Sequence, residues 1–456
     1  MFKRILVANR GEIALRVIRT CREMGIETVA VYSPADANAL HIVHSDYAEN
    51  LAGTSAAETY LNIEQIIDVA LRFGCDAVHP GYGFLSENPD FARACADEGV
   101  AFIGPSPKAI LDLGNKVKAK EIARSIGAPL IPGTVGAVAN AEEAVEFAKT
   151  AGFPLIIKAA AGGGGRGMRV VRNIEELPKL LASAQNEARS AFGNDEVFIE
   201  RYIERPKHIE FQVLADHHGN VVHLGERDCS IQRRHQKLIE EAPSPALTPQ
   251  LRERMGGVAV ALARAADYTN AGTVEFLLDA DGRFYFMEMN TRLQVEHPVT
   301  EQVTFIDLVR QQIRIAAGEV LDIVQEDVQI RGHSFEVRIN AEDPLRGFMP
   351  ALGRINRYIP PAGPGVRMDS AAYEGYAIPS LYDSMVGKLI TYGRDRQQAI
   401  EKMRRALGEF IVTGVSTTIP FHKYVFDHPQ FISGDFHTGF VEEHFSDARI
   451  TQMLRS

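Results

Sequence analysis

Short apolar runs and helical stripes alternate through the first quarter of the chain. The run 4–8 is short enough for a buried strand, the amphipathic stretch 11–24 has helical spacing, and 27–32 is again a strand pattern. The same alternation continues over 63–73, 76–79, 89–98 and 101–103. This βαβ order predicts a doubly wound, Rossmann-like α/β domain with a parallel sheet.

Strand patterns predominate later in the chain. We expect strands over 153–158, 168–171, 196–203, 208–214, 334–342 and several short ones within 354–389, with helices over 305–317 and 396–409. In 334–342 the apolar and polar side chains alternate and so point to opposite faces, with Arg338 on the polar one. The first domain is therefore followed by an α+β arrangement.

A hairpin is predicted where the runs 272–278 and 284–290 flank the turn signal Asp-Gly at 281–282. A two-residue turn would place Glu275 directly across from Glu288. A four-residue loop would offset this pair by two residues but keep the face, whereas a three-residue loop would break the argument. The prediction is therefore a pair of opposed carboxylates.

Strand period puts Glu288 on the same face as Phe284, Phe286 and Asn290. Opposed like charges destabilise a sheet unless something offsets them, and Mg²⁺ takes carboxylate ligands together with substrate phosphates. A solvated hairpin face with two surface glutamates is the alternative. The metal is favoured because a planar cation, an amide and a third carboxylate follow in one irregular run: Arg292, Gln294 and Glu296. Together they suit a small anion held beside a nucleotide phosphate.

A run of four glycines at 162–165 follows an apolar strand that ends in Lys158, and another strand pattern begins at 168. Backbone N–H groups in such a loop can close over phosphates, and glycine lets the backbone approach closely. A P-loop is excluded, because the lysine precedes the glycines and no Gly-Lys-Ser/Thr follows. We expect a flexible strand–loop–strand lid here rather than the tip of an ordinary hairpin.

Three other segments carry groups that suit an anion, and each has an ordinary alternative. The segment 226–237 is dense in cations and donors, as an anion site or a surface loop would be. The loop 79–87 follows the carboxyl end of a strand, where open α/β sheets bind ligands, but Gly/Pro-rich loops are common without a site. The lysines of 115–120 fit a solvated helix start, and Arg338 fits an ion pair with a neighbouring glutamate.

Composition limits the kind of protein. At 456 residues the chain is too long for one ordinary core, so two or three domains are expected. The net charge of −10 and the pI of about 5.8 argue against a nucleic-acid binder. The four cysteines have no C-x-x-C spacing and fit a reduced, cytoplasmic setting, and no segment is long and apolar enough to span a membrane.

These pieces together resemble the ATP-grasp superfamily, and more narrowly biotin carboxylase, across essentially the whole chain. The resemblance rests on six motifs in order, at 6–14, 79–88, 162–168, 233–237, 288–298 and 382–385. It implies a Rossmann-like domain over 1–113, an ATP-grasp domain over 114–330 with a mobile glycine-rich lid at about 131–203, a mixed β-rich C-terminal domain over 331–446 and a tail over 447–456.

The resemblance also implies roles for residues at matching positions. ATP would be bound by Lys116, Lys158, Gly162, Gly163, Gly164, Gly165, Met168, Glu200, His208, Gln232, His235, Glu275 and Glu288, and by backbone groups of Arg201, where the family often has lysine, and Ile203. Two magnesium or manganese ions would be held by Glu275, Glu288 and Asn290, and bicarbonate by Lys237, Arg292, Gln294, Val295 and Glu296. Glu296 would deprotonate bicarbonate, Arg338 would stabilise the biotin enolate, and Tyr82 would contact biotin.

By the same resemblance the protein would carboxylate biotin with ATP and bicarbonate through carboxyphosphate. The chain has no Ala-Met-Lys-Met-like biotin attachment site and no room for a carboxyltransferase after Ser456. Biotin is therefore expected on a separate biotin carboxyl carrier protein, and the carboxyltransferase on separate subunits. We expect a free-standing homodimeric subunit of an acetyl-CoA, pyruvate or other acyl-CoA carboxylase.

Two other functions share part of this pattern. Another ATP-grasp ligase, which makes an acyl phosphate from a larger carboxylate, would use the same ATP and metal residues but leaves Arg292, Glu296 and Arg338 less explained. A nucleotide-binding regulatory subunit without turnover would be expected to lack Glu296, Arg338 or a metal ligand, and all of these are present.

Overall fold

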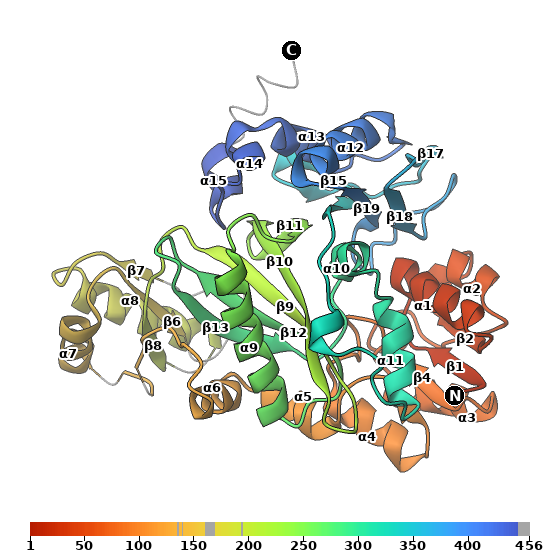
Figure 1. The fold of residues 1–456 in the computed structure, drawn as a ribbon, viewed down its shortest axis with the longest axis horizontal. Coiled ribbons are helices and arrows are strands. Elements are labelled where there is room, and N and C mark those ends of the chain that lie inside the picture. The colour runs from red at the N-terminus through yellow and green to blue at the C-terminus, as the bar shows by residue number, and fades with distance from the viewer. Residues whose placement is uncertain (135, 139, 160–168, 193–194, 446–456) are drawn as a thin grey trace.

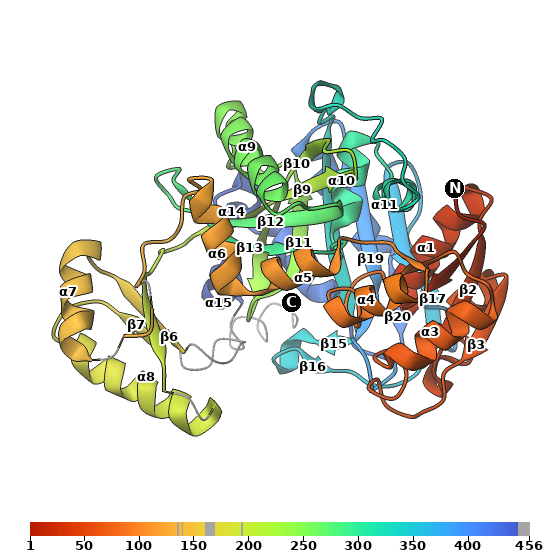
Figure 2. The same cartoon turned by 90° about the horizontal axis from the view of Figure 1, so that it is seen from below.

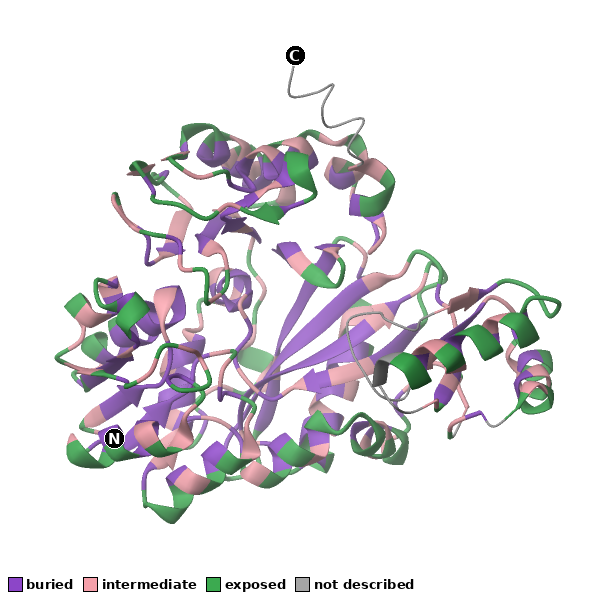
Figure 3. Cartoon of the chain, turned by 180° about the vertical axis from the view of Figure 1, so that it is seen from behind, coloured by how far each residue is buried: buried purple, intermediate pink, exposed green. Residues whose placement is uncertain are grey.

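The computed structural model describes residues 1–134, 136–138, 140–159, 169–192 and 195–445. A large sheet lies at the centre, with the N-terminal elements on one side, the described residues of 141–201 on the other and the C-terminal helices above (Figure 1). Buried residues, purple in Figure 3, concentrate along the strands of this sheet. Among the described residues, no helix combines the length and the apolar character needed to cross a membrane.

The N-terminal residues form a five-stranded parallel sheet in the order β3-β2-β1-β4-β5, which confirms the doubly wound fold. The elements are β1 (Arg4–Val7), α1 (Gly11–Glu23), β2 (Glu27–Tyr32), α2 (Leu40–His44), β3 (Tyr47–Asn50), α3 (Ile63–Arg72), β4 (Ala77–His79), α4 (Pro89–Asp97), β5 (Ala101–Phe102) and α5 (Pro107–Gly114). The strand order reverses between β1 and β4, where ligands bind in such sheets. The loops after these strands meet there, because the Asn9 amide donates to the carbonyl oxygens of Pro80 (2.7 Å) and Tyr82 (2.8 Å).

A small sheet in the order β7-β6-β8 stands at the edge of the molecule, away from the N-terminal sheet (Figure 2). Its elements are α7 (Ala141–Ala151), β6 (Leu155–Ala159), β7 (Arg169–Val171), α8 (Leu177–Phe192) and β8 (Val197–Arg201). They share a core of their own around Leu155 and Ile199. β6 and β7 pair antiparallel, with Leu155 opposite Val171, as a strand–loop–strand unit requires. The loop between them, with Gly162, Gly163, Gly164, Gly165 and Met168, lies outside the described residues.

The central sheet has eight strands in the order β13-β12-β9-β10-β11-β14-β19-β18. They are β9 (Lys207–Ala215), β10 (Val221–Arg233), β11 (Gln236–Ala242), β12 (Asn270–Leu278), β13 (Phe284–Asn290), β14 (His333–Asn340), β18 (Val366–Ser370) and β19 (Met385–Gly393). The helix α9 (Pro249–Ala265) covers β9 and β10 on one face. Because β11 pairs with β14, with Glu240 opposite Glu336, the sheet is continuous across residue 330.

The hairpin of β12 and β13 forms the predicted pair by an unexpected route. Asp279 donates its N–H to the carbonyl oxygen of Arg283 (2.9 Å) across a three-residue loop, whose last residue is a glycine with φ of +77°. This is a common hairpin connection. The pairing then skips Met287, and this β-bulge brings Glu288 back to a position opposite Glu275. The predicted two-residue turn is wrong, but the predicted pair is confirmed.

The bulge also changes the faces of β13. The expectation that Phe284, Phe286, Glu288 and Asn290 share a face is wrong, because the extra residue after Phe286 reverses the alternation. Phe284 and Phe286 instead pack edge-on against Phe276 in the core. The centroid of the Phe276 ring lies 5.5 Å from that of Phe284 and 6.5 Å from that of Phe286. Glu288 and Asn290 face the other side, where they line a cleft.

Two helices follow β13 where one is predicted. They are α10 (His297–Thr304) and α11 (Leu308–Ala316), so the predicted helix over 305–317 begins later than expected. Phe305 ends α10 in the left-handed conformation, with φ of +59°. Asp307 then caps α11 by accepting the Arg310 N–H (2.9 Å), which fixes the new start.

The C-terminal elements cover the other end of the central sheet. They are β15 (Glu342–Asp343), β16 (Met349–Pro350), β17 (Arg357–Ile359), α12 (Arg396–Glu409), β20 (Ile411–Thr413), α13 (Ile419–Asp427), α14 (Pro429–Ser433) and α15 (Phe440–His444). Phe335, Val337 and Ile339 of β14 enter the core beneath these helices, as the alternation predicts. The opposite face of β14 carries Arg338 and lines the cleft.

Candidate active site

A cleft of about 1500 Å³ brings most of the predicted site residues together. Its walls come from the loops after β1 and β4, the central strands, and the irregular run after β13. The predicted residues that line it are Tyr82, Lys116, Lys158, Arg201, Ile203, His208, Gln232, His235, Lys237, Glu275, Glu288, Asn290, Arg292, Gln294, Val295 and Arg338. Glu200 and Glu296 lie just behind this lining, each bonded to a lysine that belongs to it.

Two lysines converge on Glu200 at one end of the cleft. The ammonium groups of Lys158 and Lys120 each lie 2.6 Å from its carboxylate, the first from β6 and the second from α6 (Lys116–Ser125). Burial raises the pKa of Glu200, but the two lysines outweigh this and lower it, so the carboxyl is ionised. Lys120 is absent from the predicted site, although it lies four residues after Lys116 and so on the same helix face, a spacing that identifies it.

Apolar side chains line the cleft beside these lysines. They are Ile131, Ile156, Ile203, Leu277 and Met287. Arg201 ends β8 and Ile203 follows two residues later, so backbone groups outside the strand lie beside the apolar surface. Apolar walls with a few fixed polar groups are the usual setting for a flat heteroaromatic ligand.

The cation-rich segment 226–237 forms most of β10 and the start of β11, with a tight turn between them. Arg233 pairs with Gln236, so Arg234 and His235 make a two-residue turn with φ angles of +49° and +65°. This conformation is uncommon outside glycine, and where the surroundings hold it the residue often serves a site. The turn lines the cleft, so this part of the segment lies within the candidate site.

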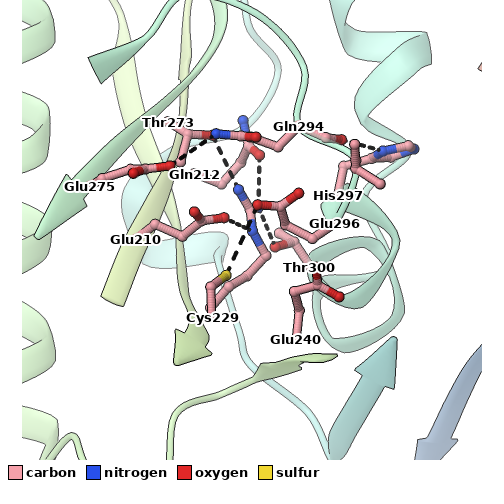
Figure 4. A network of polar contacts seen from close by, with 12 residues as sticks. Glu210, Gln212, Cys229, Glu240, Thr273, Glu275, Gln294, Glu296, His297 and Thr300 are labelled. Atoms are coloured by element: carbon pink, nitrogen blue, oxygen red, sulfur yellow. Dashed lines mark hydrogen bonds and ion pairs between the residues drawn. The ribbon is translucent and has the colours of Figure 1, made fainter. Parts of the chain in front are cut away.

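A buried network of charged and polar side chains includes Lys237 and Glu275 of the cleft lining (Figure 4). The Lys237 ammonium contacts three carboxylates, those of Glu210, Glu275 (2.9 Å) and Glu296 (2.6 Å). Glu210 also lies 2.5 Å from Arg227, so it has a second cation. Taking one member out of such a buried network leaves its partners uncompensated, which is costly.

Glu296 is fully buried and still ionised. Burial raises its pKa, but Lys237, Arg338 and Arg227 together lower it well below the usual range. One carboxylate oxygen lies 2.6 Å from Lys237 and the other 2.9 Å from Arg338. A carboxylate held in this way is a weak base, and its basicity rises when either cation is drawn away.

Glu275 and Glu288 are the opposed carboxylates that the hairpin predicts. Glu275 has close partners, since it accepts from the Asn290 amide (2.9 Å) and lies 3.1 Å from His208. For Glu288, burial and the charge of Glu275 raise the pKa, and Lys116 opposes this shift. Positive charge is therefore in short supply at Glu288. Two carboxylates and an amide oxygen are hard ligands that fit Mg²⁺.

Two other groups of side chains have ligand atoms within 4.8 Å of one another: His208, Glu210 and Glu275, and Glu210, Cys229 and Glu296. Both include Glu210, which already bonds Lys237 and Arg227. Glu275 also bonds Lys237, so a metal would compete with that lysine at either carboxylate. The pair Glu275 and Glu288 fits a metal better, because burial and Glu275 raise the pKa of Glu288 and the nearby cations only partly offset this. The Cys229 thiol stays protonated, because burial raises its pKa well above the usual value.

The irregular run after β13 holds Arg292 from two sides. Its guanidinium lies 2.9 Å from Glu87 and donates to the side-chain oxygen of Gln294 (3.0 Å). Glu87 comes from the loop after β4, so that Gly/Pro-rich loop takes part in the site. Gln294 in turn donates to Glu275 (3.3 Å). A guanidinium, an amide and the nearby Lys237 form a small group suited to a planar oxyanion.

Arg338 lies between Glu240 (2.6 Å) and Glu296 (2.9 Å), so the ion pair expected as its alternative role is present on the cleft wall. Burial lowers the pKa of Arg338, but the neighbouring glutamates raise it by more than burial lowers it, so the guanidinium stays charged. Tyr82 lines the same cleft and donates its hydroxyl to Glu12. A fixed cation of this kind can stabilise negative charge that develops on a substrate.

Three charged members of this network are missing from the predicted site: Glu210, Arg227 and Glu240. β9 did carry a signal, since the polar residues His208, Glu210 and Gln212 alternate with apolar ones. His208, Glu210 and Gln212 are all buried, which is unusual for a polar strand face. A period-two row of polar residues next to a predicted cation cluster identifies such a face.

Three family models match the chain. Residues 1–110 match the biotin carboxylase N-terminal domain, residues 115–324 the ATP-binding domain of the carbamoyl-phosphate synthase L chain, and residues 336–443 the biotin carboxylase C-terminal domain. The chain is 58% identical to a biotin carboxylase of Nostoc sp. (strain PCC 7120) over 97% of this chain and 99% of that protein. It is 55% identical to a pyruvate carboxylase subunit of Methanothermobacter thermautotrophicus, over 97% of this chain and 90% of that protein.

A solved structure is similar over the same extent. It is the biotin carboxylase domain dimer of the Hydrogenobacter thermophilus 2-oxoglutarate carboxylase, in complex with MgADP, ADP and bicarbonate. The TM-score is 0.90 at 52% sequence identity, and the match covers 97% of this chain and 98% of that chain.

Proposed function

The chain belongs to the biotin carboxylase family, and we propose that the charged residues gathered in its cleft carry out the reaction of that family. The protein is an ATP-dependent ligase, which uses bicarbonate to convert biotin to N-carboxybiotin through carboxyphosphate, with ADP and phosphate as the other products. The observation that carries the assignment of the chemistry is the ionised, fully buried Glu296 between Lys237 and Arg338 on the cleft wall.

The nucleotide is assigned to the end of the cleft where Lys158, Lys120 and Glu200 meet. Cations that bond a single carboxylate can turn to the phosphates when ATP binds, and the apolar surface beside them suits adenine. Lys116, His208, Gln232 and His235 complete this wall. Gly162, Gly163, Gly164, Gly165 and Met168 are assigned to the phosphates because they connect β6 to β7.

Magnesium is assigned to Glu275, Glu288 and Asn290, and manganese and a second ion are part of the same proposal. The support is the shortage of positive charge at Glu288 together with an all-oxygen ligand set. When bound, the metal neutralises charge on the phosphates during transfer. The protein's own part is to fix these carboxylates on a paired hairpin, which sets their separation.

Bicarbonate is assigned to Lys237, Arg292, Gln294, Val295 and Glu296. As it binds, its charge draws Lys237 away from Glu296, and the basicity of Glu296 rises. Glu296 then accepts the proton of bicarbonate while a bicarbonate oxygen attacks the γ-phosphorus, which gives carboxyphosphate and ADP. Holding both groups in place supplies most of such a rate enhancement.

Biotin is assigned to the side of the cleft with Tyr82 and Arg338. Carboxyphosphate breaks down to CO₂ and phosphate, the phosphate takes the ureido proton, and the ureido nitrogen attacks CO₂. Arg338 stabilises the enolate-like oxygen, and this requires that it exchange Glu240 or Glu296 for the substrate.

We propose three domains, over 1–113, 114–330 and 331–446, followed by a tail over 447–456. We further propose a cytoplasmic homodimer that acts on a biotin carboxyl carrier protein beside carboxyltransferase subunits. Support comes from the relatives, since one of them is part of a larger carboxylase and another forms a domain dimer. Their names include pyruvate and 2-oxoglutarate carboxylases, and acetyl-CoA or another acyl-CoA is an equally suitable final acceptor.

The test is phosphate release by the purified protein with ATP and Mg²⁺, with bicarbonate and free biotin each added or withheld. We expect release that requires bicarbonate and rises with biotin. Glu296→Gln keeps the size of the side chain but removes the base, and it should lower the rate by about 10²-fold or more. Glu253→Gln, the same change at an exposed position on α9, is the matched control and should leave the rate unchanged.

Two outcomes contradict the proposal. ATP hydrolysis that is indifferent to bicarbonate and biotin would identify another ATP-grasp ligase. Nucleotide binding without any turnover would identify a regulatory subunit.

A further inference from the structure

Lys388 on β19 is a fully buried lysine that lies between three parts of the molecule. Its ammonium donates to the carbonyl oxygen of Val295 (2.7 Å), in the run between β13 and α10. It also lies 3.3 Å from the carboxylate of Glu12 on α1. A single side chain thereby joins the C-terminal half of the central sheet, the N-terminal domain and the proposed bicarbonate run.

Stability alone does not explain this lysine. Lys388 lies directly opposite Arg338 across β14 and β19, and like charges in that position destabilise a sheet. Burial lowers the pKa of Lys388, but Glu12, Glu336 and Asp369 raise it by more than burial lowers it, so the ammonium stays charged. A buried ion pair is weak evidence for stability, so the particular contacts of Lys388 say more about its role than its charge does.

The carbonyl that Lys388 bonds, that of Val295, indicates what this lysine does. The Val295 C=O and the Glu296 N–H belong to one planar peptide unit, so a bond to that oxygen fixes the peptide from which the Glu296 side chain departs. The preceding carbonyl, that of Gln294, is held in the same way by the ring of His297 (2.9 Å). Side chains therefore hold both carbonyls, and the Gln294 oxygen also accepts the backbone N–H of His297 (3.3 Å).

The second contact of Lys388 leads to the proposed biotin side. Glu12 accepts the hydroxyl of Tyr82, and the Lys388 ammonium lies 5.9 Å from the centroid of the Tyr82 ring. Lys388 thus has one partner in the bicarbonate run and reaches Tyr82 through the other. The two contacts can be removed separately, because Glu12→Gln removes the charge of the Glu12 contact and leaves the bond to Val295 in place.

We propose that Lys388 is a positioning residue for the bicarbonate site, which holds the Val295–Glu296 peptide in place through its bond to the Val295 carbonyl oxygen. This inference rests on the proposed function of that site. Lys388 touches no reacting atom, and its effect is on where Val295 and Glu296 lie. Loss of the bond should therefore weaken the use of bicarbonate and spare the use of ATP.

The test is the steady-state formation of ADP with bicarbonate, ATP and free biotin varied in turn, for wild type, K388M, E12Q and the double variant E12Q/K388M. We expect K388M to raise the KM for bicarbonate about tenfold or more, and to change the KM for ATP by less than about twofold. E12Q should leave the bicarbonate KM near wild type and change the KM for free biotin. The double variant removes both charges together and should show the raised bicarbonate KM even if K388M alone folds poorly.

Lys402 offers a matched control on α12. It too donates to a backbone carbonyl oxygen, that of Tyr392 (2.7 Å), so K402M removes the same kind of bond outside the cleft and should leave all kinetic constants unchanged. An unchanged bicarbonate KM in a folded K388M or E12Q/K388M would overturn the inference, as would an equal rise of all three KM values. Absence of bicarbonate-dependent turnover in wild type would overturn the proposed function itself.

Discussion

Removal of Lys237 tests whether the buried charge network behaves as the contacts indicate. Its ammonium contacts Glu210, Glu275 and Glu296, and K237M leaves three buried carboxylates with one positive charge fewer. Breaking a buried ion pair costs roughly 3–5 kcal/mol. Glu210 keeps Arg227 and Glu296 keeps Arg338, so we expect the free energy of unfolding to fall by about 3 kcal/mol near pH 8.

The loss should depend on pH in a definite direction. Burial raises the pKa of Glu275 and of Glu296, but Lys237 and the other cations lower both below their usual range, so this contribution of Lys237 is present above the unfolded pKa and is lost only in acid. The pKa of Glu240 is about 7, mainly because of burial, and Lys237 is one of the charges that lower it. Without Lys237 these carboxyls bind protons more tightly, so their pKa values in the folded protein rise. Each carboxyl whose folded pKa is raised above its unfolded value lowers the free energy of unfolding as the pH rises, by about 1.4 kcal/mol per pH unit for each proton released.

The difference between wild type and K237M should therefore be larger at pH 8 than at pH 6. Urea unfolding followed by far-UV circular dichroism measures it, since the chain has no tryptophan to serve as a fluorescent probe. The control is K149M, which breaks an exposed pair with Glu146 (3.0 Å) and should cost no more than about 1 kcal/mol. A loss no larger than that of K149M, or one equal at the two pH values, would refute the reasoning.

Two other variants test separate ends of the cleft. Glu288→Gln should raise the Mg²⁺ concentration needed for turnover. Burial and the charge of Glu275 raise the pKa of Glu288, so its ionised form costs stability above that pKa. The variant should therefore unfold at a higher urea concentration than wild type at pH 8, and this gain in stability should be smaller at pH 5. Lys120→Met should raise the KM for ATP by roughly threefold to tenfold, equivalent to about 0.7–1.4 kcal/mol, whereas Lys118→Met, which breaks an exposed pair with Glu121, should not.

The opposed pair of Glu275 and Glu288 could be predicted from the sequence, but the path to it could not. The Asp-Gly signal fits a two-residue turn and also a three-residue loop with glycine in the left-handed position, and the structure has the second. A three-residue loop alone would have moved the pair out of register. Met287 restores it, and an apolar residue in an apolar strand gives no sign that it will form a bulge. The same bulge explains why the predicted face of Phe286 was wrong.

Local signals could not reveal which residues form the ion pairs behind the cleft. Arg338 and Glu240 lie on β14 and β11, and Lys388 and Glu12 on β19 and α1, so each pair depends on how segments distant in sequence are brought together. The cation-rich run and the acidic hairpin were visible because each is local. Their partners lie on other strands or, for Glu12, on a helix, and only the folding of the chain makes them neighbours.

The resting arrangement of Glu296 suggests how the site limits wasteful turnover. With Lys237 and Arg338 both in contact, Glu296 is ionised but poorly basic, so it has little tendency to activate water in place of bicarbonate. Under the proposed assignment, bicarbonate draws on Lys237 and biotin draws on Arg338, so each substrate would remove one of the two restraints. The strength of the base then depends on the presence of its substrates, and the peptide that carries it must stay in place while these cations move. The bond from Lys388 to the Val295 carbonyl oxygen supplies such a fixed point.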